Sequence, residues 1–210
     1  MDELLEKYIC SRIDPEPELL KELRRETYVR FLNPRMLSGH LQGRVLAMLC
    51  KMIRPRRVLE LGTFTGYSTL CLAEGLPAGS RILSIDHNDE LEEHLRAWFS
   101  RSELGSKIDL LFGEAADLIP ELTASFDLVY MDIDKREYKS CYDLLLHKMS
   151  SGAFILTDNT LWNGKPLEEI SYKDAQSIAI ADFNDYIAAD SRVEKIILPI
   201  RDGLTILRIK

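Results

Sequence analysis

Two short acidic segments each follow an apolar run of the kind that forms a buried strand. The first, residues 131–135 (Met-Asp-Ile-Asp-Lys), follows the apolar run at residues 126–130. The second, residues 157–160 (Thr-Asp-Asn-Thr), follows the run at residues 153–156. Burying a carboxylate at the end of an apolar strand costs several kcal/mol unless the carboxylate is paired or bound to a cation. These segments therefore indicate a site that binds a charged group.

The two segments contain three carboxylates, one amide and one lysine, namely Asp132, Asp134, Asp158, Asn159 and Lys135. Carboxylate and amide oxygens suit a hard divalent cation such as magnesium, calcium or manganese, and they suit zinc or copper poorly. The pattern therefore predicts a divalent-cation site at two neighbouring strand ends. Two simpler interpretations stay open, which are an Asx turn at Asp158 and Asn159 and solvated loop carboxylates at Asp132 and Asp134.

A third segment, residues 60–68, carries a turn of sequence Gly-Thr-Phe-Thr-Gly between a strand-like run and a helix-like run. Its glycines let the backbone approach a ligand closely, but the spacing differs from the dinucleotide fingerprint and from a phosphate loop. Asp86 ends the next strand-like run, about 20 residues beyond Gly66, where a carboxylate accepts hydrogen bonds from ribose hydroxyls. Glu60 adds a negative charge beside the turn, which disfavours a phosphate. These features predict S-adenosylmethionine, which has a ribose and a positive sulfonium and lacks phosphate.

A methyl donor beside a divalent cation indicates methyl transfer to oxygen. The reaction needs a deprotonated oxygen held against the methyl group, whereas a phenol titrates near pH ~10. A divalent cation can chelate two adjacent oxygens, stabilise the anion and orient the acceptor. Lys135 lies one helical turn beyond Asp132, and a lysine beside a metal has a lowered pKa, which makes Lys135 a candidate general base. A surface ion pair with Asp134 is the plain alternative for Lys135.

These residues need a sheet to position them, and the chain has the pattern of one. Strand-like and helix-like runs alternate, which is typical of a parallel sheet with helices on both faces. Five such strands are predicted at residues 57–61, 81–86, 107–112, 126–132 and 153–158. Two more, at 193–200 and 204–209, are joined by Arg-Asp-Gly, a hairpin signal that predicts an antiparallel pair. Helices are predicted in the first 50 residues and at 66–74 and 91–102.

Length and composition set the broad class. The 210 residues, 46% of them hydrophobic, are enough for a single domain spanning residues 1–210. There is no apolar run of the ~20 residues that span a membrane, and the charged N-terminus has no signal-peptide pattern, so a cytoplasmic location without a membrane partner is expected. The net charge of −7 is unlike the electrostatic footprint of bulk nucleic-acid binding.

Together these motifs resemble the cation-dependent class I O-methyltransferases, the family of caffeoyl-coenzyme A and catechol O-methyltransferases, and most of all its small bacterial members. The resemblance runs from roughly residue 30 to the C-terminus and is carried by residues 60–68, 132–135, 158–164 and 198–204. It implies an α/β fold with a Rossmann-like, doubly wound, seven-stranded and mostly parallel sheet. It also implies a homodimer in which the N-terminal helices of residues 1–50 contribute to the acceptor pocket.

The same resemblance implies roles for individual residues. The implied metal ligands are Asp132, Asp158 and Asn159, and Asp132 with Lys135 would form the catalytic pair. Implied cofactor contacts are Ser38, Glu60, Gly62, Thr63, Ser68, Asp86, Ala115 and Asp134, and the implied acceptor contacts are Asn163 and Trp162. For Trp162, simple packing is an equal alternative. Arg201 replaces a frequent family glycine, and the poorly matched N-terminal segment leaves the acceptor undefined.

Three functions are consistent with these residues. The first is methylation of a hydroxyl group on a small catechol-like acceptor. The second keeps this chemistry but acts on a hydroxylated nucleoside of transfer RNA, such as 5-hydroxyuridine, which also has adjacent oxygens. The third is a non-catalytic module that binds S-adenosylmethionine without a metal. A nicotinamide-dependent dehydrogenase is disfavoured by the missing third glycine of the turn.

Overall fold

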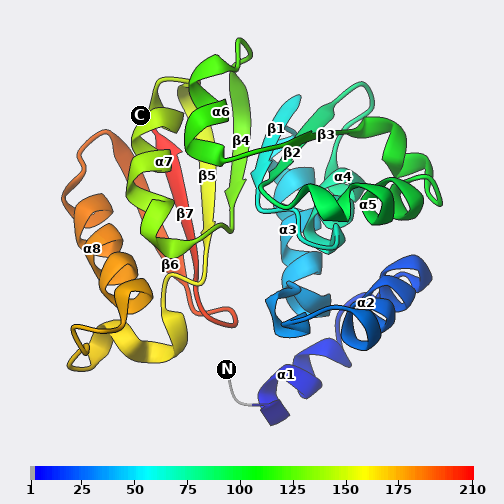
Figure 1. The fold of residues 1–210 in the computed structure, drawn as a ribbon, viewed down its shortest axis with the longest axis horizontal. Coiled ribbons are helices and arrows are strands. Elements are labelled where there is room, and N and C mark those ends of the chain that lie inside the picture. Colours follow the sequence, from blue (N-terminus) through cyan, green and yellow to red (C-terminus); the bar gives the residue numbers. More distant parts are fainter. Residues whose placement is uncertain (1–2) are drawn as a thin grey trace. The chain divides into compact units, whose positions relative to one another are not determined.

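A computed structural model describes residues 3–210. Its seven strands form a mixed sheet in the order β3-β2-β1-β4-β5-β7-β6 (Figure 1). The strands are β1 (Arg57–Leu61), β2 (Arg81–Asp86), β3 (Ile108–Phe112), β4 (Phe126–Met131), β5 (Met149–Asp158), β6 (Val193–Leu198) and β7 (Leu204–Ile209). The predicted α/β class, seven-stranded sheet and C-terminal antiparallel hairpin are confirmed.

Helices connect the strands, as the alternating pattern predicts. They are α1 (Glu3–Cys10), α2 (Glu18–Arg30), α3 (Gly39–Ile53), α4 (Tyr67–Gly75), α5 (Glu92–Phe99), α6 (Ala115–Glu121), α7 (Tyr138–Leu146) and α8 (Ala175–Ala189). Short 3₁₀ helices are η1 (Pro34–Met36), η2 (Asp89–Leu91), η3 (Glu103–Lys107), η4 (Lys135–Glu137) and η5 (Trp162–Leu167). Within residues 3–210, no helix is both long enough and apolar enough to cross a bilayer.

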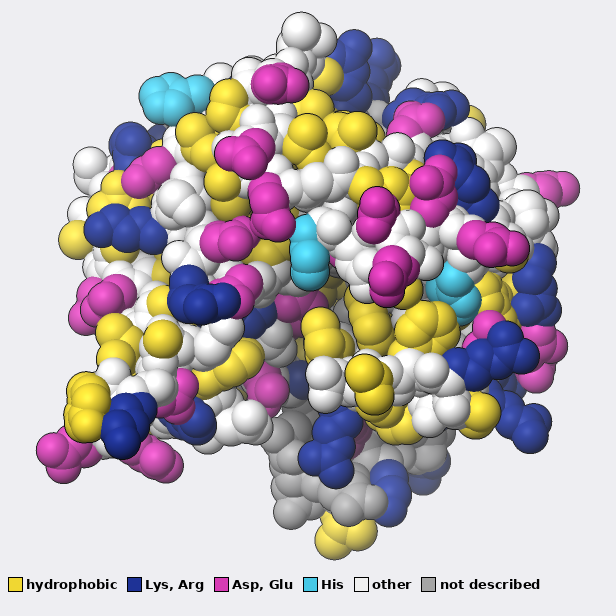
Figure 2. Space-filling view, viewed as in Figure 1, with side chains coloured by type: hydrophobic (Ala, Val, Ile, Leu, Met, Phe, Trp, Pro, Cys, Tyr) yellow, Lys and Arg dark blue, Asp and Glu magenta, His cyan; other side chains and the backbone are white. Residues whose placement is uncertain are grey.

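The chain divides into two compact units. The first comprises the residues up to Arg56 together with Thr63–Phe112, and the second comprises Arg57–Gly62 together with Gly113–Lys210. On the face shown in Figure 2, acidic side chains are interspersed with basic and hydrophobic ones. The single domain over residues 1–210 stays a prediction.

The second unit is built on β1, β4 and β5, which run parallel with one another. Leu61 pairs with Met131 and Met131 pairs with Thr157, so these strands end at the same edge. Their inward side chains are fully buried, which explains their near-continuous apolar sequences. Just beyond β1, Gly62 has a positive φ of 94°, and a Cβ atom there would overlap the Asp132 carbonyl oxygen. Only glycine fits this close approach of two strand ends.

The first unit contains β2 and β3, which pair in parallel, with α2, α3, α4 and α5. Helices α3 and α4 pack closely because small residues lie between them. A Cβ atom at Gly43 would lie 2.6 Å from the Cys71 sulfur, and one at Gly75 would overlap the Ala47 carbonyl oxygen.

Three predicted boundaries differ from the structure by two residues or more. Strand β5 begins at Met149 instead of residue 153, because Met149 pairs with Phe126 ahead of a register shift. Helix α5 ends at Phe99 instead of residue 102, where the Ser100 hydroxyl donates to the Ala97 carbonyl and competes with the helical pattern. Strand β6 ends at Leu198, just before the turn.

Candidate functional site

The carboxyl ends of β4 and β5 bring two of the predicted acidic residues together. Asp132 directly follows β4, and Asp158 is the last residue of β5. Because Met131 is paired with Thr157, the residues that follow them lie side by side at one edge of the sheet. Both belong to the second unit. The geometry therefore agrees with the expectation of a polar cluster at two neighbouring strand ends.

Lys135 reaches back into this cluster from the start of η4. Its side chain is only 5% exposed. The ammonium nitrogen Nζ donates to Asp132 Oδ1 at 2.8 Å and to the Tyr138 hydroxyl at 2.7 Å. It also lies 4.6 Å from the ring centre of Tyr138 and 5.7 Å from that of Trp162. Lys135 is therefore a buried and fixed side chain, which excludes the interpretation of a surface lysine paired with Asp134.

Tyr138, which the sequence did not single out, joins the two strand ends. Its hydroxyl is hydrogen-bonded to the Met131 carbonyl at 3.1 Å and to the Asp158 carbonyl at 3.0 Å. Burial, together with the nearby carboxylates of Asp132 and Asp158, raises the pKa of Tyr138 well above 10.0. The phenol is therefore neutral and keeps its proton. The only signal in the sequence is that Tyr138 lies one helical turn beyond Lys135.

Asp158 is held by hydrogen bonds on both carboxylate oxygens. Oδ2 accepts from the Tyr130 hydroxyl at 3.0 Å, and Oδ1 accepts from the Asn159 backbone N–H at 2.8 Å. Asn159 has a φ of 56°, in the left-handed region that asparagine tolerates better than most residues. The Asp158 carboxylate thus accepts from the next residue and not from Thr160, whose N–H donates to the Gly203 carbonyl, so the Asx turn of the simpler interpretation is not formed here. These hydrogen bonds fix the carboxylate and do not preclude a second role as a ligand.

The donor set fits a hard divalent cation. The cluster contains the carboxylates of Asp132 and Asp158, and Asn159, whose side chain carries an amide oxygen, directly follows Asp158 in the chain. Two carboxylates and the single ammonium group of Lys135 leave one excess negative charge in a largely buried network. Across residues 3–210, no group of three or more His, Cys, Asp and Glu side chains forms a ligand set. Magnesium is usually bound by one or two carboxylates and keeps several waters, so the two carboxylates of this cluster are compatible with it.

The two predicted acceptor residues lie in η5, beside the cluster. Trp162 and Asn163 both have positive φ, 41° and 54°. The β6–β7 turn supports this segment, because the Asp202 carbonyl accepts from the backbone N–H of Leu161 at 2.7 Å and of Trp162 at 3.2 Å. The Trp162 ring lies near Lys135, whereas Asn163 is exposed to solvent.

Four of the predicted donor contacts belong to the second unit. Glu60 is fully buried and paired in register with Tyr130, and Gly62 lies against Asp132. Ala115 is buried at the first position of α6. Asp134 caps η4, and hydrogen bonds from Arg136 lower its pKa to about 2. Its contact with the cofactor stays a prediction.

The other four predicted donor contacts lie in the first unit, around the turn that follows β1. Asp86 Oδ2 accepts from the backbone N–H groups of Thr63 at 2.9 Å and Phe64 at 2.7 Å, and Oδ1 accepts from that of Asn88 at 2.9 Å. An ionised carboxylate has about four acceptor sites, so Asp86 keeps little capacity beyond holding the turn. Ser38 and Ser68 are both buried. A ribose hydroxyl at Asp86 stays a prediction.

The chain matches known proteins over nearly its whole length. The model of an O-methyltransferase family matches residues 10–210. Caffeoyl-CoA O-methyltransferase 2 of Zea mays is 34% identical over 99% of this chain and 83% of that protein. Tricin synthase 1 of Oryza sativa subsp. japonica is 33% identical over 97% of this chain and 87% of its own length. The structure of the O-methyltransferase TomG from Streptomyces achromogenes, in complex with SAM, superposes with a TM-score of 0.89 at 26% identity and covers all of both chains.

Proposed function

Because the chain belongs to the O-methyltransferase family, we propose that it transfers a methyl group from S-adenosylmethionine to a hydroxyl group of a small catechol-like acceptor held beside a divalent cation. The donor is supported by TomG, a 26% identical neighbour whose structure contains SAM. The acceptor class is supported by the caffeoyl-CoA O-methyltransferases, which are about one third identical over nearly the whole chain.

One observation carries the proposal for the acceptor site. The buried ammonium group of Lys135 is held between a carboxylate of the cluster, Asp132, and a neutral phenol, Tyr138, at 2.8 and 2.7 Å. A lysine that only neutralised a carboxylate would gain little from a second, neutral partner at this distance. A lysine that must keep Nζ at one point gains a fixed position from it.

In the proposed reaction, these side chains hold the acceptor and receive its proton. Asp132, Asp158 and Asn159 would hold the cation, which when bound stabilises an oxyanion and orients two adjacent oxygens. Lys135 in its neutral form takes the proton of the acceptor hydroxyl at Nζ. Tyr138 keeps Nζ in place and at the same time anchors the Asp158 backbone. S-adenosylmethionine supplies the methyl group from its sulfonium.

The indole ring of Trp162, whose centre lies 5.7 Å from Lys135 Nζ, is proposed to limit the access of water to Lys135. Exclusion of water favours this reaction because an oxyanion and a sulfonium neutralise one another as the methyl group moves. Trp162 is thus proposed as one wall of the acceptor site, and the exposed Asn163 as a contact at its entrance.

The proposal is tested by methyl transfer from labelled S-adenosylmethionine to a panel of catechols, with magnesium or with a chelator. We expect turnover of a free catechol in the presence of magnesium. A chelator should abolish this turnover, and added magnesium should restore it. Asp132→Asn should abolish most of it, whereas Asp127→Asn, at the opposite end of β4, should not. Full activity of Asp132→Asn in the presence of chelator would overturn the cation mechanism.

The same panel separates the other functions. Turnover confined to hydroxylated transfer RNA would replace the catechol-like acceptor with a nucleoside. Donor binding without any turnover, unaffected by Asp132→Asn, would indicate a binding module. We further propose a homodimer in the cytoplasm, and sedimentation of the purified chain tests the homodimer.

A further inference from the structure

The turn that follows β1 adopts a costly conformation that needs support from its surroundings. Phe64 has a φ of 47° and Gly66 a φ of 88°. The left-handed region is unfavourable for a bulky side chain such as phenylalanine. Asp86 supports one side of the turn through the backbone N–H groups of Thr63 and Phe64. The side chains of residues 64–67 are held by other contacts.

A buried carboxylate from the N-terminal segment contacts the end of the turn. Glu16 is 7% exposed and accepts a hydrogen bond from the Tyr67 hydroxyl at 2.6 Å. Arg24 also donates to it, from Nε at 3.1 Å and from Nη2 at 2.8 Å. Burial raises the pKa of Glu16, but the hydrogen bonds from Arg24 and Tyr67 outweigh it and leave the pKa below its usual value. The carboxylate is therefore charged at neutral pH.

Helix α2 contacts the middle of the same turn. The hydroxyl groups of Thr27 and Thr65, both fully buried, are hydrogen-bonded at 3.0 Å. Just beyond α2, the ring of Phe31 packs edge-to-face on Phe64, with centroids 6.2 Å apart. The segment of residues 16–31 thus contacts Phe64 and Thr65 in the turn. It also contacts Tyr67, the first residue of α4. All of these residues belong to the first unit.

We propose that residues 16–31 form a brace that sets the conformation of the donor-binding turn, with Glu16 and Thr27 as its positioning residues. This inference rests on the proposed function in one respect, which is that the turn binds S-adenosylmethionine. Neither residue needs to touch the donor. Glu16 acts through Tyr67 and Thr27 acts through Thr65, and both reduce the freedom of a turn that binding would otherwise have to order.

A buried carboxylate is a costly choice for a purely structural contact. Well-packed apolar residues of similar volume are often at least as stabilising as a buried ion pair. What a fixed carboxylate with three donors offers is one defined geometry, and a ligand-binding turn depends on geometry more than on stability alone.

The test compares binding of S-adenosylhomocysteine, measured by calorimetry, in variants of the whole chain. We expect Glu16→Gln and Thr27→Val to raise the dissociation constant about tenfold at a temperature far below each thermal midpoint. Thr27→Ser, which keeps the hydroxyl group, should restore wild-type binding. Glu18→Gln is the matched control, since Glu18 is an exposed carboxylate of the same segment paired with Lys21.

A double-mutant cycle shows whether Glu16 acts through Tyr67. If it does, Glu16→Gln combined with Tyr67→Phe should bind no more weakly than Glu16→Gln alone. Dissociation constants within twofold of wild type for both Glu16→Gln and Thr27→Val, or fully additive losses in the cycle, would overturn the brace. If the wild-type chain itself binds no S-adenosylhomocysteine, the proposed function fails and the brace with it.

Discussion

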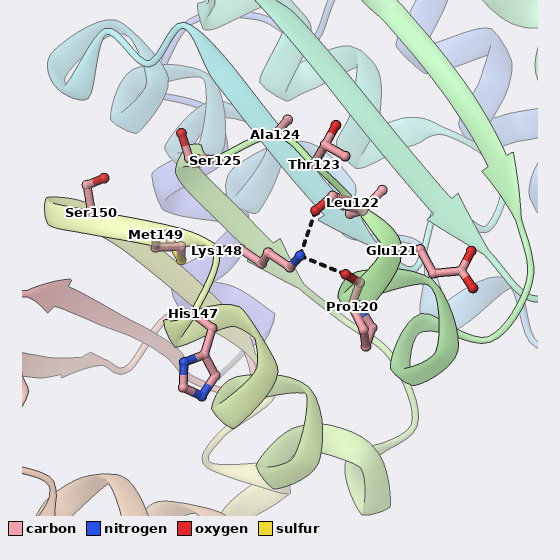
Figure 3. Close-up of a pocket in the computed structure, with 10 residues that line it drawn as sticks. All are labelled: Pro120, Glu121, Leu122, Thr123, Ala124, Ser125, His147, Lys148, Met149 and Ser150. Carbon is pink, nitrogen blue, oxygen red and sulfur yellow. Dashed lines mark hydrogen bonds between the residues drawn. The ribbon is translucent and has the colours of Figure 1, made fainter.

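Two lysines at opposite ends of the same pair of strands have contrasting surroundings. Lys135 lies beyond the carboxyl end of β4, and its Nζ is held by a carboxylate and a phenol. Lys148 precedes β5 at the other end, where it borders an open cavity of about 470 Å³. Figure 3 shows its side chain reaching two backbone carbonyls, those of Pro120 at 2.8 Å and Leu122 at 2.6 Å.

The Lys148 arrangement recurs elsewhere in the chain. Lys107 donates to the carbonyls of Ala73 and Leu76 at the end of α4. Lys195 donates to those of Ile187 and Ala188 at the end of α8. Each lysine thus donates to carbonyls at or next to a helix C-terminus, where its charge complements the helix dipole. Lys148 does the same at the end of α6.

The contrast teaches how a structural lysine differs from a positioned one. A lysine that caps a helix donates to neutral carbonyls, so its ammonium group is not paired with a carboxylate. Lys135 bonds a carboxylate that is itself 22% exposed and a phenol that is fully buried. The Asp132 carboxylate is therefore accessible to a ligand, whereas the Lys135 side chain is held in place. The cavity at Lys148 offers an ammonium group that is already hydrogen-bonded to two backbone carbonyls.

Replacing each lysine by methionine should give the largest difference between the two ends. Lys135→Met removes the proposed proton acceptor, and we expect kcat to fall by about 10²- to 10⁴-fold, the usual range for general-base catalysis. Lys148→Met should leave kcat within about twofold. Steady-state kinetics with a catechol acceptor measure both. Comparable losses of kcat in the two variants would show that Lys135 has no special role in catalysis.

Removal of one hydroxyl group tests the support of Lys135. Tyr138→Phe deletes the contact that holds Nζ, and we expect kcat to fall about tenfold, which is about 1.4 kcal/mol of transition-state stabilisation. Tyr142→Phe, one turn further along α7, is the matched control, because its hydroxyl contacts Asp190 instead. If KM rises and kcat is unchanged in Tyr138→Phe, the phenol contributes to binding and not to the position of Nζ.

The polar cluster could be predicted largely from the sequence, since the end of an apolar strand is a local signal. The alternation of strands and helices fixed which strand ends are neighbours, so Asp132 and Asp158 were expected together. The sequence does not predict the two tyrosines that complete the cluster, because Tyr130 lies in an apolar run, where a tyrosine is usually core, and Tyr138 lies in a charged segment. The partner of a hydroxyl group is decided by tertiary packing, as with Tyr130 and Asp158.

The brace of the donor turn was also beyond local reasoning. Glu16 and Tyr67 lie 51 residues apart, and no periodicity links them. Pro15 and Pro17 lie between α1 and α2, and α2 begins directly after Pro17. The position of the Glu16 carboxylate beside the turn depends on tertiary contacts, which exist only in the folded chain.

Replacement of Lys148, which has a structural role, should lower the stability of the fold. Lys148→Met leaves two carbonyls at the end of α6 without their charged donor, and we expect the free energy of unfolding to fall by about 1 kcal/mol. Urea denaturation followed by circular dichroism measures the change. Lys195→Met should give a similar loss if both lysines cap helices. An unchanged unfolding free energy in both variants would show that water replaces the ammonium group.

The smallest effect is expected at the exposed rim of the Lys135 end, where Asp134 pairs with Arg136. The pKa of Asp134 is lowered from 3.8 to about 2, chiefly by the hydrogen bonds of Arg136. A carboxyl group with a depressed folded-state pKa stabilises the fold above its unfolded pKa, and this contribution is lost as the pH falls from about 3.8 to about 2. Because Arg136 is exposed, the contribution should stay below about 1 kcal/mol.

Arg136→Gln should therefore lower the unfolding free energy slightly at pH 7 and hardly at all at pH 2, which flattens the acid limb of the stability curve. Urea midpoints measured across this range give the slope. Arg192→Gln is the matched comparison, because Arg192 pairs with Asp190 at the same sequence spacing and lowers its pKa in the same way. An acid limb unchanged by Arg136→Gln would mean that Gln176 and the backbone N–H of residue 136, each of which donates to Asp134 at 2.9 Å, are enough to hold the carboxylate.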